Sequence, residues 1–338
     1  MKNRSDLIDN YKVMLIFLVV LGHLMEWYSV ASLPGVFRAI IYSFHMPAFV
    51  FLSGFFSKNV EKNMEIAWER CILPYLVFNT IWIFLVQVLE HSMKIWQINV
   101  FVANYAFWYL LSLFFWRVLT PYFARLRFAL LILAAFALYV GCFPEFNRFL
   151  SASRTIVYFP FFLLGYYTTE KHIQKIRRIP RIWGWFMLLV CFGITALCNI
   201  YGIFPVKSYE NMLCYHDIGV NNLQGIIMRL IQMIIAVVLL LAWLNVLPDK
   251  KLRITGIGKE TVTIYLLSCF ILYGIRKLTD ELHMTSVLAA NGVRLVLLSI
   301  LVSLVVVYVC SRKKICAGYR KFFGCLGAVF FKKNEKMS

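Results

Sequence analysis

The sequence predicts an all-α, polytopic membrane protein with about ten transmembrane helices. Hydrophobic residues make up 61% of the 338 residues and charged residues only 15%, so the chain lacks the polar residues that cover a soluble domain of this size. Apolar stretches of about 20 residues, the length that crosses a hydrocarbon core of ~30 Å, recur along the whole chain. Most of the 35 Lys and Arg lie in the short segments between those stretches.

Ten apolar stretches are interpreted as spans. Their expected ranges are 11–30, 35–57, 70–90, 99–118, 127–143, 154–169, 182–201, 222–247, 258–276 and 286–311. Small residues at 29–31 resemble a signal-peptide cleavage site, but the apolar stretch before them is long enough to span and carries ionisable residues. We therefore expect it to be retained as the first helix.

The basic residues orient the spans. When the spans are threaded in order, the segments richest in Lys and Arg fall on one side: those near 58–70, 117–127, 171–181 and 250–259, and the tail after 311. By the positive-inside rule, both termini are expected to be cytoplasmic. The expected location is a cell membrane, with many passes, and specifically the inner or plasma membrane of a bacterium.

The sequence predicts one transmembrane domain over 1–311 and a basic, aromatic cytoplasmic tail over 312–338 that lies on the anionic inner leaflet. The formal charge of +19 forms no single solvated face, which argues against nucleic acid as a partner. Nine cysteines without a CxxC pair are typical of small membrane residues rather than of a disulfide or zinc framework. Cys214, His216 and Asp217 lie together but lack further ligands, so no metal is expected.

Two histidines interrupt the apolar pattern of the first two spans. By the helical rise, His23 lies roughly 17 Å from Lys12 at the inner end of the first span, and His45 lies about 18 Å from the inner end of the second. Ionisable groups inside spans usually face a cavity or each other, so two histidines at one depth are expected to share a cavity. The alternative is that each imidazole only donates to a neighbouring carbonyl.

Glu26 lies on the same helix face as His23, because residues three apart are neighbours on a helix. A carboxylate there would hold the imidazole in one tautomer and stabilise its charged form, as in an acid–base dyad. Alternatively, Glu26 reaches water at the outer interface. Pro47 removes a backbone hydrogen bond inside the second span, and the resulting bend would open a pocket at the depth of His45.

Six segments resemble the integral-membrane acyltransferase 3 family, in particular the fucose 4-O-acetylase-like sugar acetyltransferases. They are IDNYKVMLIFLVVLGH (8–23), FHMPAFVFLSGFF (44–56), ERCILPYLVF (69–78), FWYLLSLFFW (107–116), FFLLGYY (161–167) and GKETVTIYLLS (258–268). The resemblance spans nearly the whole chain in the expected order, and the first three segments are the more specific ones.

The resemblance implies transfer of an acyl group, usually acetyl from cytoplasmic acetyl-CoA as co-substrate, to a hydroxyl of a glycan, a lipid-linked glycan or another envelope molecule. The family's histidine in the first helix matches His23, and its basic positions before that histidine and before the third helix match Lys12 and Arg70. We expect His23, Glu26 and His45 to be catalytic, and Lys12 and Arg70 to bind the acyl-CoA.

The chemistry is consistent with that resemblance. A neutral imidazole at His23 would take the proton of an alcohol that attacks the thioester, and the CoA phosphates would need cations at the inner mouth. Arg117, Arg125, Arg127, Arg177 and Arg178 are also available as cations at that mouth, although topology explains most of these basic residues, and Arg70 is the preferred one. Many family members have a histidine where this chain has Ser268, so any role of that histidine is absent here or belongs to another group.

Three arginines near the outer ends of spans, Arg154, Arg229 and Arg294, are expected either to bind an acceptor glycan or lipid pyrophosphate, or to reach lipid head groups. The main alternative function is a transporter or flippase for lipid-linked sugars, which would also use buried ionisable groups and bent helices. A third hypothesis, a non-catalytic sensor or scaffold, predicts that no pocket joins His23 to the cytoplasm.

Overall fold

The computed structural model describes residues 5–26, 33–91, 99–147 and 149–331. Within these residues every regular element is a helix, and one isolated antiparallel bridge joins Val102 to Phe149. The all-α fold class that the sequence predicts is therefore confirmed.

Each of the ten expected spans contains a helical segment. These helices are α1 (Asp6–Met25), α2 (Leu33–Tyr42) with α3 (His45–Phe55), α5 (Leu73–Leu89), α6 (Trp108–Phe123), α7 (Ala129–Tyr139), α8 (Ala152–Tyr167), α10 (Arg181–Ile200), α11 (Asn222–Val246), α12 (Thr261–Glu281) and α14 (Gly292–Cys310). Shorter or peripheral helices are α4 (Val60–Glu65), α9 (Glu170–Arg178), α13 (Met284–Ala289) and α15 (Lys313–Phe330).

The number of crossings is only partly supported. Among the described residues, seven helices are long and apolar enough to cross a membrane, with Leu33–Phe55 and Trp68–Leu89 each taken as one span. Helices α6, α7 and α8 have 16, 11 and 16 residues, shorter than the roughly 20 that a bilayer core requires. The protein is thus a multi-pass membrane protein, but the expected count of about ten is not confirmed.

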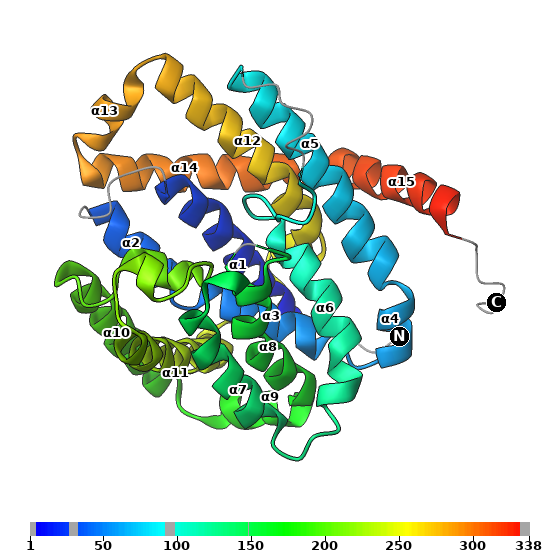
Figure 1. Ribbon diagram of the computed structural model, residues 1–338, viewed down its shortest axis with the longest axis vertical. Helices are drawn as coiled ribbons and strands as arrows, with labels where there is room; N and C mark the ends of the chain where they lie inside the picture. Colours follow the sequence, from blue (N-terminus) through cyan, green and yellow to red (C-terminus); the bar gives the residue numbers. More distant parts are fainter. Residues whose placement is uncertain (1–4, 27–32, 92–98, 148, 332–338) are drawn as a thin grey trace.

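Helix α1 lies inside the bundle, where it packs against α2, α3, α12 and α14 (Figure 1). Helix α8 packs against α3, α6 and α7, and α10 pairs with α11 beside α2. Because α1 carries both Lys12 and His23, its enclosure places these two side chains among other helices instead of in lipid.

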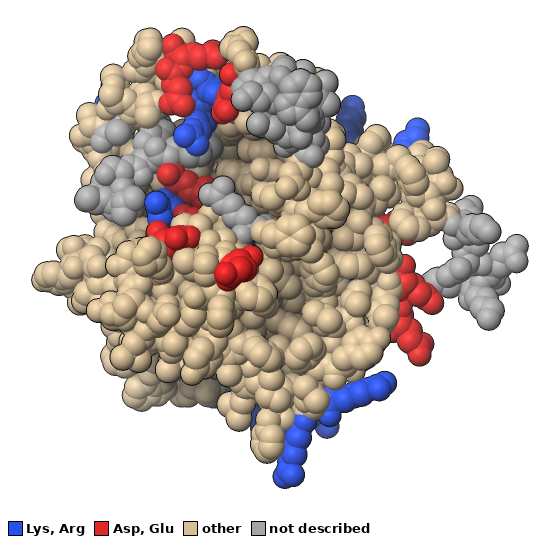
Figure 2. Space-filling model, in the orientation of Figure 1, with Lys and Arg blue, Asp and Glu red and all other residues tan. Residues whose placement is uncertain are grey.

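The outer surface suits a bilayer. In Figure 2 most of the visible face has no charged side chains, and Lys, Arg, Asp and Glu gather in its upper left part and along its right and lower edges. Large apolar side chains such as Leu131 on α7 and Leu189 on α10 are more than two-thirds exposed. Many large apolar side chains exposed together, as on α7, α10 and α14, are typical of a surface that contacts lipid.

The second expected span is broken, and the break differs from the bend expected at Pro47. Helix α2 ends at Tyr42 and α3 restarts at His45, so Pro47 falls in the first turn of α3, where its missing N–H needs no intrahelical partner. The His45 imidazole Nδ1 donates to the Ile41 carbonyl at 2.8 Å. A side chain therefore satisfies a carbonyl that the break leaves without its helical partner.

Helices α3 and α8 meet at two glycines. A Cβ on Gly54 would lie 1.9 Å from the carbonyl oxygen of Phe162, and a Cβ on Gly165 would lie 1.9 Å from the carbonyl oxygen of Phe51. Small residues allow membrane helices to approach this closely. The contact fixes α3, and with it the position of His45.

We expect Gly54→Ala to lower the thermal midpoint of the detergent-solubilised protein, because the two helix backbones must separate and overpacking typically costs about 1–3 kcal/mol. Gly193→Ala is the matched control, since Gly193 lies within α10 and a Cβ there meets no atom within 4 Å. An unchanged midpoint for Gly54→Ala would contradict the close approach of α3 and α8.

The tail after residue 311 forms helix α15 in its described part, and this helix crosses α5 as it leaves the bundle (Figure 1). The ring of Phe323 stacks on Phe78 of α5 with centroids 5.8 Å apart, and Arg320 pairs with Glu260 at 2.6 and 2.7 Å. The side chains of Phe322, Val329 and Phe330 are exposed on the same helix. Contact of α15 with the inner leaflet stays a prediction.

The sidedness of the bundle also stays a prediction, and reporter fusions test it. Reporters fused after residues 210 and 281 are expected to give an extracytoplasmic signal, whereas a fusion after 312 is expected to report the cytoplasm, because the basic segments favour the inner side. A cytoplasmic signal after 210 or 281 would refute the orientation.

Candidate active site

A cavity of about 290 Å³ lies beside the C-terminal end of α1. Its wall is formed by α1, the break between α2 and α3, segment 99–107, α6, α8, the loop that precedes α11, and α12. Its lining includes His23, Glu26, Tyr42, His45, Met46, Asn104, Tyr105, Trp108, Arg154, Glu210 and Tyr265. This cavity, called the outer cavity after the predicted orientation, brings together the three residues that the sequence predicts to be catalytic, and their roles stay a prediction.

His23 and Glu26 form a hydrogen-bonded pair. The His23 Nδ1 lies 3.1 Å from Glu26 Oε2, and the Tyr42 hydroxyl donates to Glu26 Oε1 at 2.5 Å. Because a carboxylate oxygen only accepts, Nδ1 carries the proton of the neutral ring and Nε2 keeps its lone pair. The geometry therefore favours the dyad over a glutamate that only reaches water.

Aromatic rings hold the His23 imidazole from one side. The Tyr105 ring lies 4.7 Å from the His23 ring, and Trp82 of α5 stacks on the Tyr105 ring at 4.7 Å with an interplanar angle of 6°. The backbone of Tyr105 has a φ of 47°, a left-handed value that is strained for a bulky residue. Such strain persists only where surrounding contacts determine the conformation.

Tyr105 belongs to segment 99–107, which is not helical, so the prediction of a span that begins at residue 99 is wrong here. Helix α6 begins only at Trp108, and the fully buried Asn79 of α5 anchors the segment before it. Asn79 donates to the Val102 carbonyl at 3.2 Å and accepts from the Asn104 backbone N–H at 3.0 Å. An amide in the middle of an apolar helix, Asn79, is the sequence signal for this anchor.

His45 makes the carbonyl contact that the alternative expects, since its Nδ1 donates to the Ile41 carbonyl. Its ring also lines the outer cavity and lies 4.9 Å from the Tyr42 ring. Both histidines thus face one cavity, as their matched depths predict. A catalytic role for His45 stays a prediction.

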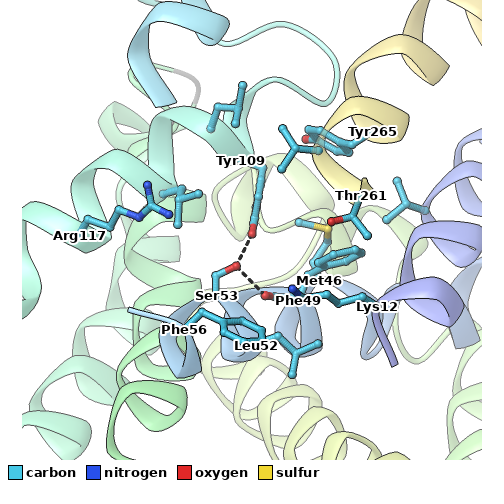
Figure 3. A pocket seen from close by; sticks show the side chains of 14 residues that line it. Lys12, Met46, Phe49, Leu52, Ser53, Phe56, Tyr109, Arg117, Thr261 and Tyr265 are labelled. Carbon is cyan, nitrogen blue, oxygen red and sulfur yellow. Dashed lines mark hydrogen bonds between the residues drawn. The ribbon is translucent and has the colours of Figure 1, made fainter. Parts of the chain in front are cut away.

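A second cavity of about 200 Å³, the inner cavity, lies nearer the N-terminal end of α1. Lys12 of α1 and Arg117 of α6 line its opposite sides, with Ser53 and Tyr109 between them (Figure 3). The Ser53 and Tyr109 hydroxyls are 2.5 Å apart, and Ser53 also donates to the Phe49 carbonyl at 3.0 Å. The inner cavity therefore presents two cations and a hydroxyl pair.

The two cavities meet at two shared residues. Among the described residues, Met46 of α3 and Tyr265 of α12 are those that line both cavities. The Tyr265 hydroxyl donates to the Ala106 carbonyl, which fixes that side chain. Met46 is unbranched and flexible, and is therefore the movable side of the junction.

Arg70, the predicted companion of Lys12, lies elsewhere. It is exposed in the helical turn Trp68–Ile72 before α5 and lines neither cavity. Its neighbour Cys71 accepts a hydrogen bond from Arg117 Nη1 at 3.2 Å. The cation that faces the inner cavity opposite Lys12 is therefore Arg117, one of the available basic residues, and not the preferred Arg70.

The loop before α11 forms part of the outer cavity wall through Tyr209, Glu210 and Met212. Arg38 of α2 donates to the Glu210 carboxylate at 2.5 Å, and Arg154 Nε donates to the Glu210 carbonyl at 2.9 Å. Burial raises the pKa of the Glu210 carboxyl above its ordinary value, although Arg38 acts in the opposite direction. The Arg38–Glu210 ion pair holds the loop against α2, and the Arg154 side chain lines the cavity wall.

A sequence model described as an acyltransferase domain matches residues 6–312, which include both cavities. The chain belongs to the acyltransferase 3 family. Nodulation protein NolL from Sinorhizobium fredii (strain NBRC 101917 / NGR234) is 25% identical to it over 237 residues, which are 64% of this chain and 62% of NolL. The match thus covers less than two-thirds of that relative. No solved structure matches the chain.

Other candidate residues of this membrane acyltransferase are placed as follows. Ser268, at the position of the later family histidine, is buried and donates to the Tyr265 carbonyl at 3.0 Å, and it lines neither cavity. Arg154 faces the outer cavity, whereas Arg229 donates to the Ala137 carbonyl at 3.0 Å and Arg294 to the Val287 carbonyl. Within the described residues, no group of three His, Cys, Asp or Glu could hold a metal ion.

Proposed function

We propose that this acyltransferase transfers an acetyl group from cytoplasmic acetyl-CoA to a hydroxyl of a cell-envelope or exported glycan, free or lipid-linked. The observation that carries the proposal is the pair of cavities that meet at Met46 and Tyr265. One cavity presents cations and the other presents a candidate general base, so a donor and an acceptor can approach the junction from opposite sides.

The inner cavity suits the donor. Lys12 and Arg117 supply charges for phosphate groups, and a guanidinium can donate two hydrogen bonds to one phosphate. The Ser53 and Tyr109 hydroxyls can bind amides of the pantetheine arm as it extends towards Met46. Exposed Arg70, one residue from Cys71, remains a proposed contact for the nucleotide end.

The outer cavity suits an alcohol acceptor. Its wall offers the Asn104 amide, the Arg154 guanidinium and the Glu210 carboxylate as hydrogen-bonding groups for hydroxyls. These groups face the same cavity as His23, so an acceptor that binds them can bring one hydroxyl to the imidazole.

The reaction follows from the dyad geometry. His23 Nε2 accepts the proton of the acceptor hydroxyl while its oxygen bonds to the thioester carbon, and Glu26 stabilises the imidazolium that forms. The carbon–sulfur bond then breaks, and the imidazolium returns the proton to the departing thiolate. The products are an acetyl ester of the acceptor and free CoA.

The purified protein, reconstituted in liposomes with acetyl-CoA labelled in the acetyl group, tests this function. We expect label to pass into an envelope glycan fraction as an alkali-labile ester. A transporter for lipid-linked sugars would instead move those lipids between leaflets without incorporating label, and that result would refute the proposal.

A further inference from the structure

We propose that Tyr42 is a positioning residue that orients the Glu26 carboxylate for His23. The proposal rests on the proposed function, because it assigns a further residue to the same general base. Tyr42 contacts Glu26 through its hydroxyl, whereas it acts on the reacting atoms only through the dyad.

The two carboxylate oxygens of Glu26 have separate partners. Oε1 accepts from the Tyr42 hydroxyl at 2.5 Å, and Oε2 meets His23 Nδ1 at 3.1 Å. Glu26 follows Met25, the last residue of α1, and its side chain is 24% exposed at the cavity. A carboxylate at an open helix end has several rotamers, and the bond from Tyr42 selects the one that faces the imidazole.

The fold brings the Tyr42 hydroxyl to this place by two contacts. A Cβ on Gly22 would lie 2.8 Å from Tyr42 Cε1, so the glycine before His23 allows the ring to lie against α1. On the other side, the Arg38 guanidinium lies 5.3 Å from the centre of the Tyr42 ring. Arg38 is buried and paired with Glu210, so the ring is held between α1 and the fastened outer loop.

The expected effect is on turnover. Positive charge develops on His23 as it takes the hydroxyl proton, and a displaced carboxylate no longer stabilises that charge. Catalytic groups need their positions held to within about 0.5 Å by their supporting hydrogen bonds. Tyr42 lines the outer cavity and is not among the residues of the inner cavity, so donor binding should be unaffected by its hydroxyl.

Kinetics of Tyr42→Phe with labelled acetyl-CoA test the proposal. We expect kcat to fall at least about tenfold, as for other hydrogen bonds to charged groups, while the KM for acetyl-CoA stays within about twofold. Tyr215→Phe is the matched control, because the buried Tyr215 hydroxyl donates to the Leu138 carbonyl at 2.6 Å and lines neither cavity. The control should keep the wild-type kcat.

A double-mutant cycle separates positioning from a structural role. If Tyr42 acts through Glu26, adding Tyr42→Phe to Glu26→Gln should change kcat little, whereas independent losses would multiply. Multiplying losses, or an unchanged kcat in Tyr42→Phe, would overturn the proposal. Where Tyr42→Phe folds poorly, Gly22→Ala provides a second test, because it displaces the ring and should reproduce the kcat loss.

The results that would refute the proposed function differ from those that would refute the role of Tyr42. A wild-type protein that transfers no label would refute the function itself, whereas a His23→Ala variant that keeps full activity would refute the role of the His23–Glu26 dyad. If the His23→Ala variant is inactive and the Tyr42→Phe variant is fully active, only the role of Tyr42 is refuted.

Discussion

His23→Ala is expected to lower acetyl transfer about 10²- to 10⁴-fold, the usual contribution of a positioned general base, while expression and membrane insertion stay at the wild-type level. The reason is the Nε2 lone pair of a ring whose Nδ1 is held by Glu26 and whose face is held by Tyr105. His45 lines the same cavity, but its Nδ1 donates to the neutral Ile41 carbonyl, so that bond gives it no carboxylate to stabilise a developing imidazolium as Glu26 does for His23.

The measurement is the transfer of labelled acetate from CoA into an envelope glycan fraction. His216→Ala is the matched control, since the His216 side chain is 97% exposed in the outer loop and far more accessible than that of His23 at 17%. Near-normal labelling by His23→Ala would rule out His23 as the general base.

The part of the site that lies on one helix could be predicted from the sequence. His23 and Glu26 are three residues apart, and helical geometry alone puts them on one face. The depths of His23 and His45 followed from the rise per residue, because both helices run through the bundle from known basic ends. Helical spacing and rise are therefore enough to predict the His23–Glu26 pair and its depth.

The parts that depend on contacts between distant segments could not be predicted. Segment 99–107 is apolar, so hydropathy predicts that it belongs to a span. Its backbone carbonyls instead accept hydrogen bonds from the side chains of Asn79 and Tyr75 on α5. The break between α2 and α3 is stabilised in the same way by the His45 side chain. An apolar stretch reveals burial but not whether its backbone bonds are helical.

The choice between basic residues at the inner side is likewise a tertiary property. Arg70 and Arg117 both lie near inner helix ends, where topology alone explains a positive charge. Which one faces the cavity depends on the rotation of α5 and α6, set by contacts such as that of Arg117 with Cys71. Single-sequence analysis has no access to that rotation.

The second large effect is expected on donor binding, because Arg117 lines the inner cavity and Arg70 does not. Arg117→Gln is expected to raise the KM for acetyl-CoA about 10- to 100-fold with a smaller change in kcat, because hydrogen bonds to charged groups contribute about 1.5–3 kcal/mol each. Arg117 lies on the inner cavity wall opposite Lys12, at the height of the Ser53 and Tyr109 pair (Figure 3). It does not reach the dyad, so it should affect binding more than chemistry.

Arg70→Gln is the informative comparison, because it removes the same charge from an exposed position outside the cavity lining. Exposed charges interact weakly through water, so we expect a smaller rise in KM than for Arg117→Gln. Steady-state kinetics at several acetyl-CoA concentrations measure both. A larger effect of Arg70 would mean that the nucleotide binds along the outer face of α5, and the inner cavity would then hold only the pantetheine arm between Lys12 and Met46.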